Sequence, residues 1–191
     1  MPISFDLEEL RDQNGCSIYL ETGLDDPTRD ISCKKALSSS FRKVYTVEIR
    51  DDLVNTARSL FRNDIDNGRL NIIHGDSANL ESYIVGNPDF SDKVVFYLDA
   101  HIDNSNITQN YIARCPLMFE LDAISKLPRN DNVIAIDDVR ILRESHPWGE
   151  TRYGHASYID MIQQRIKRIN PDYQFKYMDG YVPGDVLVAY I

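Results

Sequence analysis

Acidic residues follow one apolar run after another along this chain of 191 residues. The runs are Ser17–Leu20, Val44–Val47, Leu70–His74, Val94–Leu98 and Val133–Ile136, and the acids that follow them are Glu21, Glu48, Asp76, Asp99 and the pair Asp137 and Asp138. Each run has the length and the β-branched or aromatic content of a buried strand. Because the carboxyl ends of parallel strands lie along one edge of a sheet, where ligands bind, these six carboxylates are expected together. Their mutual repulsion indicates a cationic cofactor, a metal ion or both.

Helix-like segments separate these runs, and the C-terminus departs from the pattern. The segments expected to be helical are Arg29–Ser39, Asp51–Asp66, Ser77–Val85, Cys115–Leu127 and Ala156–Ile169. Strand–helix alternation of this kind predicts a parallel sheet with right-handed crossovers. The last two apolar runs, Tyr173–Met178 and Val186–Ile191, have only the segment DGYVPGD between them. That segment is too short for a helical crossover, so the pair is expected to form an antiparallel hairpin.

Composition narrows the class of protein further. A formal net charge of −9 argues against a nucleic-acid partner, because phosphate binding depends on clustered Lys and Arg. No apolar run approaches the ~20 residues of a membrane helix, and the N-terminal segment lacks the features of a signal peptide. The three cysteines form no CxxC pair, so neither a disulfide framework nor a zinc site is indicated. We expect one domain over residues 1–191, located in the cytoplasm, without a membrane partner.

From about Ser17 to its last residue, the chain resembles the class I S-adenosylmethionine-dependent methyltransferases. The matching stretches are, in order, YLETG, VYTVEI, IIHGDS, VVFYLDAH, CPLMFELDAI and VIAIDDVR. Within that superfamily it looks most like small sugar- or natural-product-type O-methyltransferases. The resemblance implies a Rossmann-like α/β fold with a seven-stranded, mostly parallel sheet of order 3-2-1-4-5-7-6. It also implies S-adenosylmethionine as cofactor and a hydroxyl of a sugar, glycan or small natural product as acceptor.

The resemblance assigns the cofactor to the ends of the first four strands. The residues it implicates are Glu21, Thr22, Gly23, Glu48, Ile49, Asp76, Ser77 and Asp99. Residues 21–23 match the loop around the methionine part, Glu48 matches the acid that accepts both ribose hydroxyls, and Asp76 matches the acceptor for the adenine amino group. The alternative role for Glu48 and for Asp76 is helix capping. Pro27 stands where relatives usually have a second glycine, and it lacks a backbone N–H for the cofactor.

A second constellation consists of Asp99, Asp137 and Asp138, which end two strands that are expected to be neighbours. Three carboxylates on adjacent strand ends make an all-oxygen pocket of the kind that Mg²⁺ or Mn²⁺ prefers. Catechol O-methyltransferase-like and macrocin O-methyltransferase-like enzymes use a metal at this place. The alternative is that Asp99 contacts only the cofactor and that one member of the pair caps the next segment.

Catalytic and acceptor-binding candidates lie beside these acids. His101 is two residues beyond Asp99 and titrates near neutrality, which suits a general base, and Asp138 is the second catalytic candidate. The stretch Arg140–Tyr158 is rich in His, Trp, Tyr, Arg and Gly, which suits recognition of a sugar or ring. The residues expected to bind the acceptor are Arg140, His146, Trp148, Tyr153 and His155. The alternatives are a histidine that only shapes the pocket and an ordinary surface connection. Residues 102–114 could form a second wall.

Two other functions compete with methyl transfer. A nicotinamide-dependent oxidoreductase or epimerase would share the sheet and the acid after the second strand, but it needs a GxGxxG phosphate cradle. The acidic segment LDDPTRD follows the first strand instead and would repel phosphates. A non-catalytic S-adenosylmethionine-binding domain is the other alternative, supported by Pro27 and opposed by the retention of every other acid. A homodimer, and a place as one domain of a longer glycan-modifying chain, are compatible with the sequence.

Overall fold

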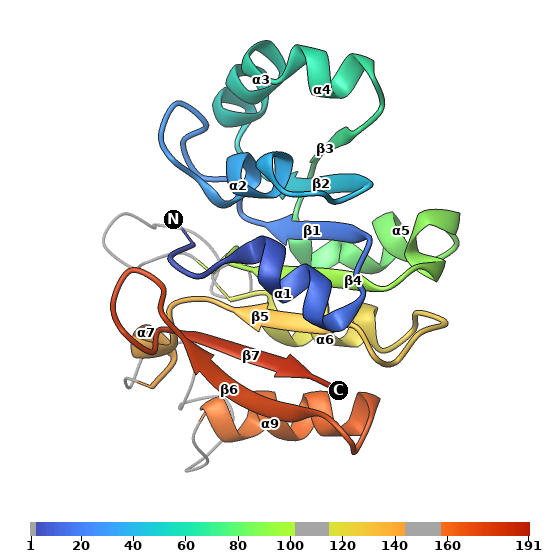
Figure 1. Ribbon diagram of the computed structural model, residues 1–191, viewed down its shortest axis with the longest axis vertical. Coiled ribbons are helices and arrows are strands. Elements are labelled where there is room, and N and C mark those ends of the chain that lie inside the picture. Colours follow the sequence, from blue (N-terminus) through green and yellow to red (C-terminus); the bar gives the residue numbers. More distant parts are fainter. Residues whose placement is uncertain (1–2, 102–114, 144–157) are drawn as a thin grey trace.

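The computed structural model describes residues 3–101, 115–143 and 158–191, and it is built on one seven-stranded sheet (Figure 1). The strands are β1 (Ile18–Thr22), β2 (Lys43–Glu48), β3 (Leu70–His74), β4 (Val94–Leu98), β5 (Val133–Ile136), β6 (Gln174–Met178) and β7 (Val186–Tyr190). Their order is β3-β2-β1-β4-β5-β7-β6. The first five strands are parallel, and β7 is antiparallel to both β5 and β6. The predicted fold class, sheet order and C-terminal hairpin are therefore confirmed.

Helices cover both faces of this sheet (Figure 1). They are α1 (Leu7–Asn14), α2 (Ser32–Ser38), α3 (Asp51–Leu60), α4 (Arg62–Asp66), η1 (Ser77–Asn79), α5 (Leu80–Ile84), η2 (Pro88–Ser91), α6 (Leu117–Ile124), α7 (Val139–Arg143) and α9 (Tyr158–Ile169). Side chains of α1, α2 and α3 pack in one apolar core, and those of α5, α6, α7 and α9 pack in the other. No helix in the described ranges is long and apolar enough to span a membrane.

Alternation along β1 shows how the two cores are divided. Ile18 and Leu20 belong to the core under α5, α6 and α9, whereas Tyr19 belongs to the core under α1, α2 and α3. Successive side chains of a strand point to opposite faces, so a strand covered on both faces is apolar at every position. This explains why the strands of the sheet centre appear in the sequence as continuous apolar runs.

Two helix predictions are wrong in detail. The single helix expected over Asp51–Asp66 is divided at Phe61, whose φ of −103° and ψ of 24° separate α3 from α4. The segment Ser77–Val85 forms η1 and α5 rather than one helix, and Asp76 is the N-cap residue of η1. The Asp76 side chain accepts a hydrogen bond from the Ala78 N–H at 2.9 Å, which satisfies a donor at the start of η1.

The hairpin loop lies at the same edge of the sheet as the ends of β1 to β5. Both β5 and β6 are antiparallel to β7, so β6 runs in the same direction as β5. The loop of residues 179–185 therefore follows the end of β6 beside the end of β5. A turn that the sequence marks only as a connection is thus placed next to the candidate site.

Candidate active site

Gly23 allows the chain to leave β1 across the end of β4. Its φ is +83°, and a Cβ at this position would lie 2.4 Å from the carbonyl oxygen of Asp99. The Asp99 N–H donates to the Thr22 carbonyl at 3.0 Å, and the Gly23 N–H donates to the Val47 carbonyl at 2.9 Å. Only glycine combines a positive φ with such a close backbone approach. The loop after β1 therefore begins against the ends of both neighbouring strands.

Glu48 ties this loop to the end of β2. Its buried carboxylate accepts the Leu24 N–H at 3.0 Å and the Arg50 N–H at 2.8 Å. Arg50, not Glu48, is the N-cap residue of α3, and α3 has no side-chain cap bond, so Glu48 holds the segment before the helix without capping it. Each carboxylate oxygen still has a second lone pair, which leaves room for ribose hydroxyls. The ribose contact stays a prediction, as does a contact by the half-exposed Ile49 beside it.

Glu21 and Thr22 are the last two residues of β1, not part of the following loop as expected. The Glu21 carboxylate is fully buried and accepts hydroxyl hydrogen bonds from Tyr19 at 3.1 Å, Ser32 at 2.5 Å and Thr46 at 2.9 Å. Burial raises the pKa of Glu21 to about 7, although the three hydroxyls favour its ionised form. Glu21 therefore lies below the edge, in the layer toward α2.

Asp76 and Ser77 end the β3 segment and begin η1. One Asp76 oxygen is used to cap η1, so the alternative role of this residue is present, and its contact with adenine stays a prediction. Ser77 is buried, whereas Asp76 is only partly so. The neighbouring Gly75 is also constrained, because a Cβ there would lie 2.2 Å from the Tyr83 hydroxyl oxygen. The turn after β3 is therefore closely packed.

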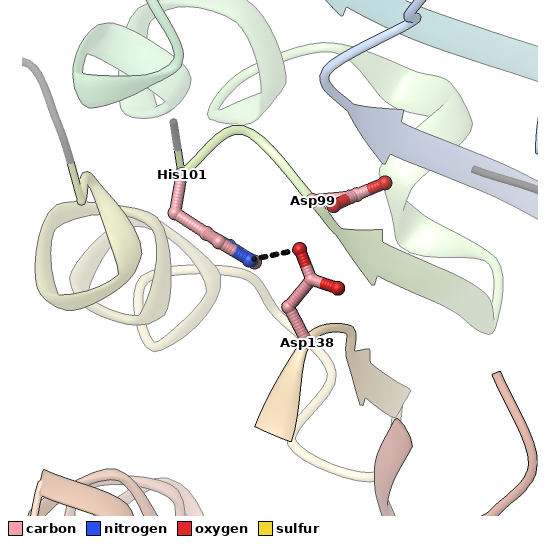
Figure 2. A group of neighbouring side chains, drawn as sticks. All are labelled: Asp99, His101 and Asp138. Atoms are coloured by element: carbon pink, nitrogen blue, oxygen red, sulfur yellow. Dashed lines mark hydrogen bonds and ion pairs between the residues drawn. The ribbon is translucent and has the colours of Figure 1, made fainter. Parts of the chain in front are cut away.

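His101 and Asp138 form a buried pair between the ends of β4 and β5. Figure 2 shows the imidazole directed at the Asp138 carboxylate with Asp99 beside them, and Nε2 lies 3.1 Å from Oδ2. Burial alone would lower the pKa of His101, but the hydrogen bond to Asp138 and the charge of Asp99 raise it. Burial would likewise raise the pKa of Asp138, yet His101 and Arg140 hold it below its ordinary value. The sequence predicted both residues but not their contact.

Asp137 and Asp99 differ from Asp138 in their surroundings. The Asp137 carboxylate accepts the Tyr97 hydroxyl at 2.5 Å and the Asp138 N–H at 2.8 Å. Burial raises the pKa of Asp137, and burial together with the charge of Asp137 raises that of Asp99. Asp138 itself has a φ of +57°, a left-handed conformation that is uncommon outside glycine. The two halves of the Asp pair therefore point to different neighbours.

The described residues offer two sets of ligand atoms that could hold a metal ion. One set is Asp99, His101 and Asp138, and the other is Asp137, Asp138 and Asp185, with all atoms of a set within 4.8 Å of one another. The predicted triad Asp99, Asp137 and Asp138 is thus divided between them. The first set includes an imidazole, a ligand that suits transition-metal ions better than Mg²⁺, and two carboxylates, which suit Mn²⁺ as well. The Arg140 guanidinium pairs with two members of the second set, Asp138 and Asp185, but with only one member of the first, so the first set fits a divalent ion better.

Arg140 and Asp185 join the hairpin loop to the Asp pair. The Arg140 guanidinium lies 2.5 Å from an Asp138 oxygen and also pairs with Asp185. In addition, the backbone N–H of Arg140 donates to Asp185 Oδ1 at 2.9 Å. Its Cζ is 5.5 Å from the ring centroid of Tyr181, which is 68% exposed. Arg140 was predicted to bind the acceptor, but here its charge is directed at two carboxylates. Asp185 was missed because an acid at the end of a turn segment resembles ordinary loop chemistry.

Four of the five residues predicted to bind the acceptor, His146, Trp148, Tyr153 and His155, lie outside the described residues. The same holds for the second wall expected over residues 102–114. The sequence also gave no sign of Glu120, a buried carboxylate in α6. A single acid in an otherwise apolar helix gives no sequence signal of its own, and only the packing of α6 shows that Glu120 is buried.

No protein-family model and no curated protein matches this chain. Solved structures do match it. An O-methyltransferase from Bacillus cereus, in complex with S-adenosylhomocysteine, is 18% identical with a TM-score of 0.56, over 97% of this chain and 79% of that chain. The methyltransferase domain of bacterial CtHen1 is 10% identical with a TM-score of 0.55, over 96% and 94% of the two chains. At these identities the likeness shows the fold, which is the Rossmann-like fold of these methyltransferases.

Proposed function

We propose that this protein is an S-adenosylmethionine-dependent O-methyltransferase that acts on a hydroxyl of a sugar, glycan or small natural product. The observation that carries the proposal is the buried Glu48 carboxylate, whose partners are two backbone N–H groups. No cationic side chain in the described ranges pairs with it, and the hydrogen-bond partners of Glu21 are likewise neutral. A cationic ligand with a ribose suits this end of the edge, because it supplies both positive charge and hydroxyl donors.

The alternatives have less support. The loop after β1 carries Asp25 and Asp26 rather than a glycine-rich cradle, and these charges would repel the pyrophosphate of a nicotinamide cofactor. The solved structures quoted above are methyltransferases, which adds support of a general kind. A non-catalytic binding domain would have no use for a buried pair such as His101 and Asp138. That pair has the composition of a general base and the carboxylate that orients it.

In the proposed chemistry, the methyl donor binds at the ends of β1 and β2, and proton transfer takes place at the ends of β4 and β5. S-adenosylmethionine, when bound, supplies an electrophilic methyl group. His101 is placed to take the proton of the acceptor hydroxyl, and because Nε2 faces Asp138, the proton would be taken up at Nδ1. Asp138 then stabilises the imidazolium, and Arg140 helps to keep Asp138 ionised. Asp99 adds a second negative charge beside the ring.

A divalent ion is a further part of the proposal. Asp99, Asp138 and His101 would hold it, and its chemistry would be to lower the pKa of a coordinated hydroxyl. The roles of His101 as ligand and as base compete for the same ring, so chelation distinguishes them. If EDTA abolishes methyl transfer and Mn²⁺ restores it, the metal role is supported. Full activity in EDTA leaves His101 and Asp138 as an acid–base pair alone.

The decisive experiment is calorimetric titration with S-adenosylhomocysteine. Wild type should bind it, and Glu48→Gln should bind at least tenfold more weakly, because hydrogen bonds to a charged acceptor are worth about 1.5–3 kcal/mol each. Glu81→Gln is the matched control, since Glu81 is an exposed acid paired with Lys126. Absence of binding to wild type, or preferential binding of NADH, would overturn the proposal. The acceptor would then be sought by transfer of a labelled methyl group to a panel of sugars and phenols.

A further inference from the structure

Glu120 is a fully buried carboxylate in the first turn of α6. The helix sequence, LMFELDAI, is mostly apolar, and the other buried residues are Leu117, Leu121, Ala123 and Ile124, all of which pack in the core. A leucine at position 120 would fill this space without the cost of removing a carboxylate from water. The presence of an acid here therefore calls for a reason other than packing.

The surroundings of Glu120 place it under three strand ends. The groups that most favour its ionised form are the hydroxyls of Thr22, at the end of β1, and Ser77, after β3, followed by the charge of His101, after β4. Burial outweighs them and raises the pKa of Glu120 to about 7, with a further contribution from Asp76. The helix packs against η1, which begins at Ser77.

The hydrogen bonding around Glu120 is incomplete. Within the described part of the chain, the hydroxyls of Thr22 and Ser77 are near enough to stabilise the charge of Glu120, but they make no well-formed hydrogen bond with either of its oxygens, and the Thr22 hydroxyl has no other partner. A buried carboxylate left in this state destabilises the fold, and proteins retain such arrangements mainly where function requires them. Thr22 and Ser77, whose hydroxyls stabilise its charge, are both residues that the resemblance assigned to the cofactor. This combination indicates that ligand binding completes the network.

We propose that Glu120 is a positioning residue of the methyl-donor site and that it acts through the hydroxyls of Thr22 and Ser77. The inference rests on the function proposed above. In the bound state the two hydroxyls donate to Glu120, so that their oxygen lone pairs are directed toward the ligand. Glu120 thereby fixes the end of β1, beside the amino-acid part of the donor, relative to the turn after β3, beside its adenine.

The test compares Glu120→Leu and Glu120→Gln with Asp122→Asn. Asp122 is an acid on the same helix whose carboxylate pairs with Arg165, so its variant controls for loss of charge from α6. Affinity for S-adenosylhomocysteine is measured by calorimetry, and Tm is measured without ligand. Glu120→Leu should lower the affinity at least tenfold and raise the ligand-free Tm by about 2–4 °C. Asp122→Asn should bind as wild type does.

A positioning role predicts that Glu120→Leu lowers the affinity for S-adenosylhomocysteine and raises the ligand-free Tm. A merely structural role predicts that both fall. If Glu120→Leu lowers both, Glu120→Gln decides, because it keeps the shape of the side chain. Weaker binding by Glu120→Gln at an unchanged Tm supports the proposal, and unchanged binding overturns it. Binding by both Glu120 variants at wild-type affinity also overturns it, while the proposed function stands because wild type binds. If wild type does not bind, the proposed function itself fails.

Discussion

The two ends of the carboxyl edge hold similar acids in different ways. At the ends of β1 and β2, Glu21 and Glu48 are satisfied by hydroxyls and backbone N–H groups. At the end of β5, Asp138 and Asp185 are paired with the cationic or basic side chains of His101 and Arg140. The first arrangement leaves Glu48 without a cationic partner among the described residues, so Glu48 can receive a cationic ligand, while Glu21 lies below it with its pKa raised to about 7. The second is neutralised from within, so it can hold and return a proton.

This difference appears in the direction of the pKa shifts. Burial raises the pKa of Glu21 to about 7, because neutral hydroxyls compensate a buried charge only in part. The pKa of Asp138 is held below its ordinary value, because His101 and Arg140 overcome the effect of burial. Glu21 and Asp138 therefore have pKa shifts of opposite direction. Variants at the two ends should differ accordingly.

The largest effect is expected at the proton-transfer end. His101→Ala should lower kcat by about 10²–10⁴ while affinity for S-adenosylhomocysteine stays nearly unchanged, because in the proposed mechanism the ring takes the proton and does not hold the donor. The pH–rate profile should lose its limb near neutrality. His101→Gln is the matched variant, since it can still hydrogen-bond Asp138 but cannot act as a base at neutral pH. A variant that keeps kcat and raises KM would make His101 an acceptor-binding residue instead.

At the donor end, the largest effect is expected from Gly23→Ala. The new Cβ would lie 2.4 Å from the Asp99 carbonyl oxygen, and the residue would have a φ of +83°. We expect a loss of about 3 kcal/mol in the free energy of unfolding and weak or absent binding of S-adenosylhomocysteine.

Gly68→Ala provides the control for Gly23→Ala, because Gly68 has a φ of +75° but nothing lies within 4 Å of its added Cβ. It should cost only about 1 kcal/mol, the conformational part of the effect. Urea denaturation of both variants measures the difference. Equal losses would mean that the chain can pass the end of β4 with a side chain at position 23, and the close approach would then have no functional weight.

The sequence was sufficient for the features that depend on local pattern. Apolar runs gave every strand to within two residues, and the short DGYVPGD connection required the antiparallel pairing of β6 with β7. The acids at the strand ends were found for the same reason. The break at Phe61 was missed. Apolar residues keep their helical spacing through this position, but the backbone leaves the helical conformation there.

Contacts between distant residues were beyond the sequence. The pairing of His101 with Asp138 joins positions 37 apart, and the pairing of Arg140 with Asp185 joins positions 45 apart. Both depend on how β4, β5 and the hairpin loop lie beside one another. Glu120 is a similar case, since the groups that stabilise its charge lie at or just after the ends of three different strands. Spacing along the chain can place an acid at an edge, but it does not say what compensates the charge.

A smaller effect is expected where the hairpin loop meets the Asp pair. Asp185→Asn removes the buried partner of a half-buried arginine and should lower the free energy of unfolding by about 2–3 kcal/mol, somewhat less than for a fully buried pair. Asp179→Asn at the other end of the loop is the control, because Asp179 is exposed and, among the described residues, its side chain accepts only the Gly184 N–H. If the two variants are equally stable, Arg140 is held by Asp138 alone.

The smallest effect is expected in the pH dependence of stability, which tests the buried Glu21 carboxylate at the end of β1. The pKa of Glu21 is raised from 4.5 to about 7 on folding, so the native state binds the extra proton and its stability falls as pH rises between those values. From pH 8 to pH 6, Glu21 should therefore add roughly 1 kcal/mol to the free energy of unfolding. Glu21→Gln should show a gain smaller by that amount in urea denaturation at the two pH values, because the amide does not titrate. The lowered pKa of Asp138 has the opposite sign, and its contribution is lost only in stronger acid, as pH falls through its folded value. If Glu21→Gln retains the full gain, the carboxylate is ionised when buried, and the three hydroxyls compensate its charge far better than burial penalises it.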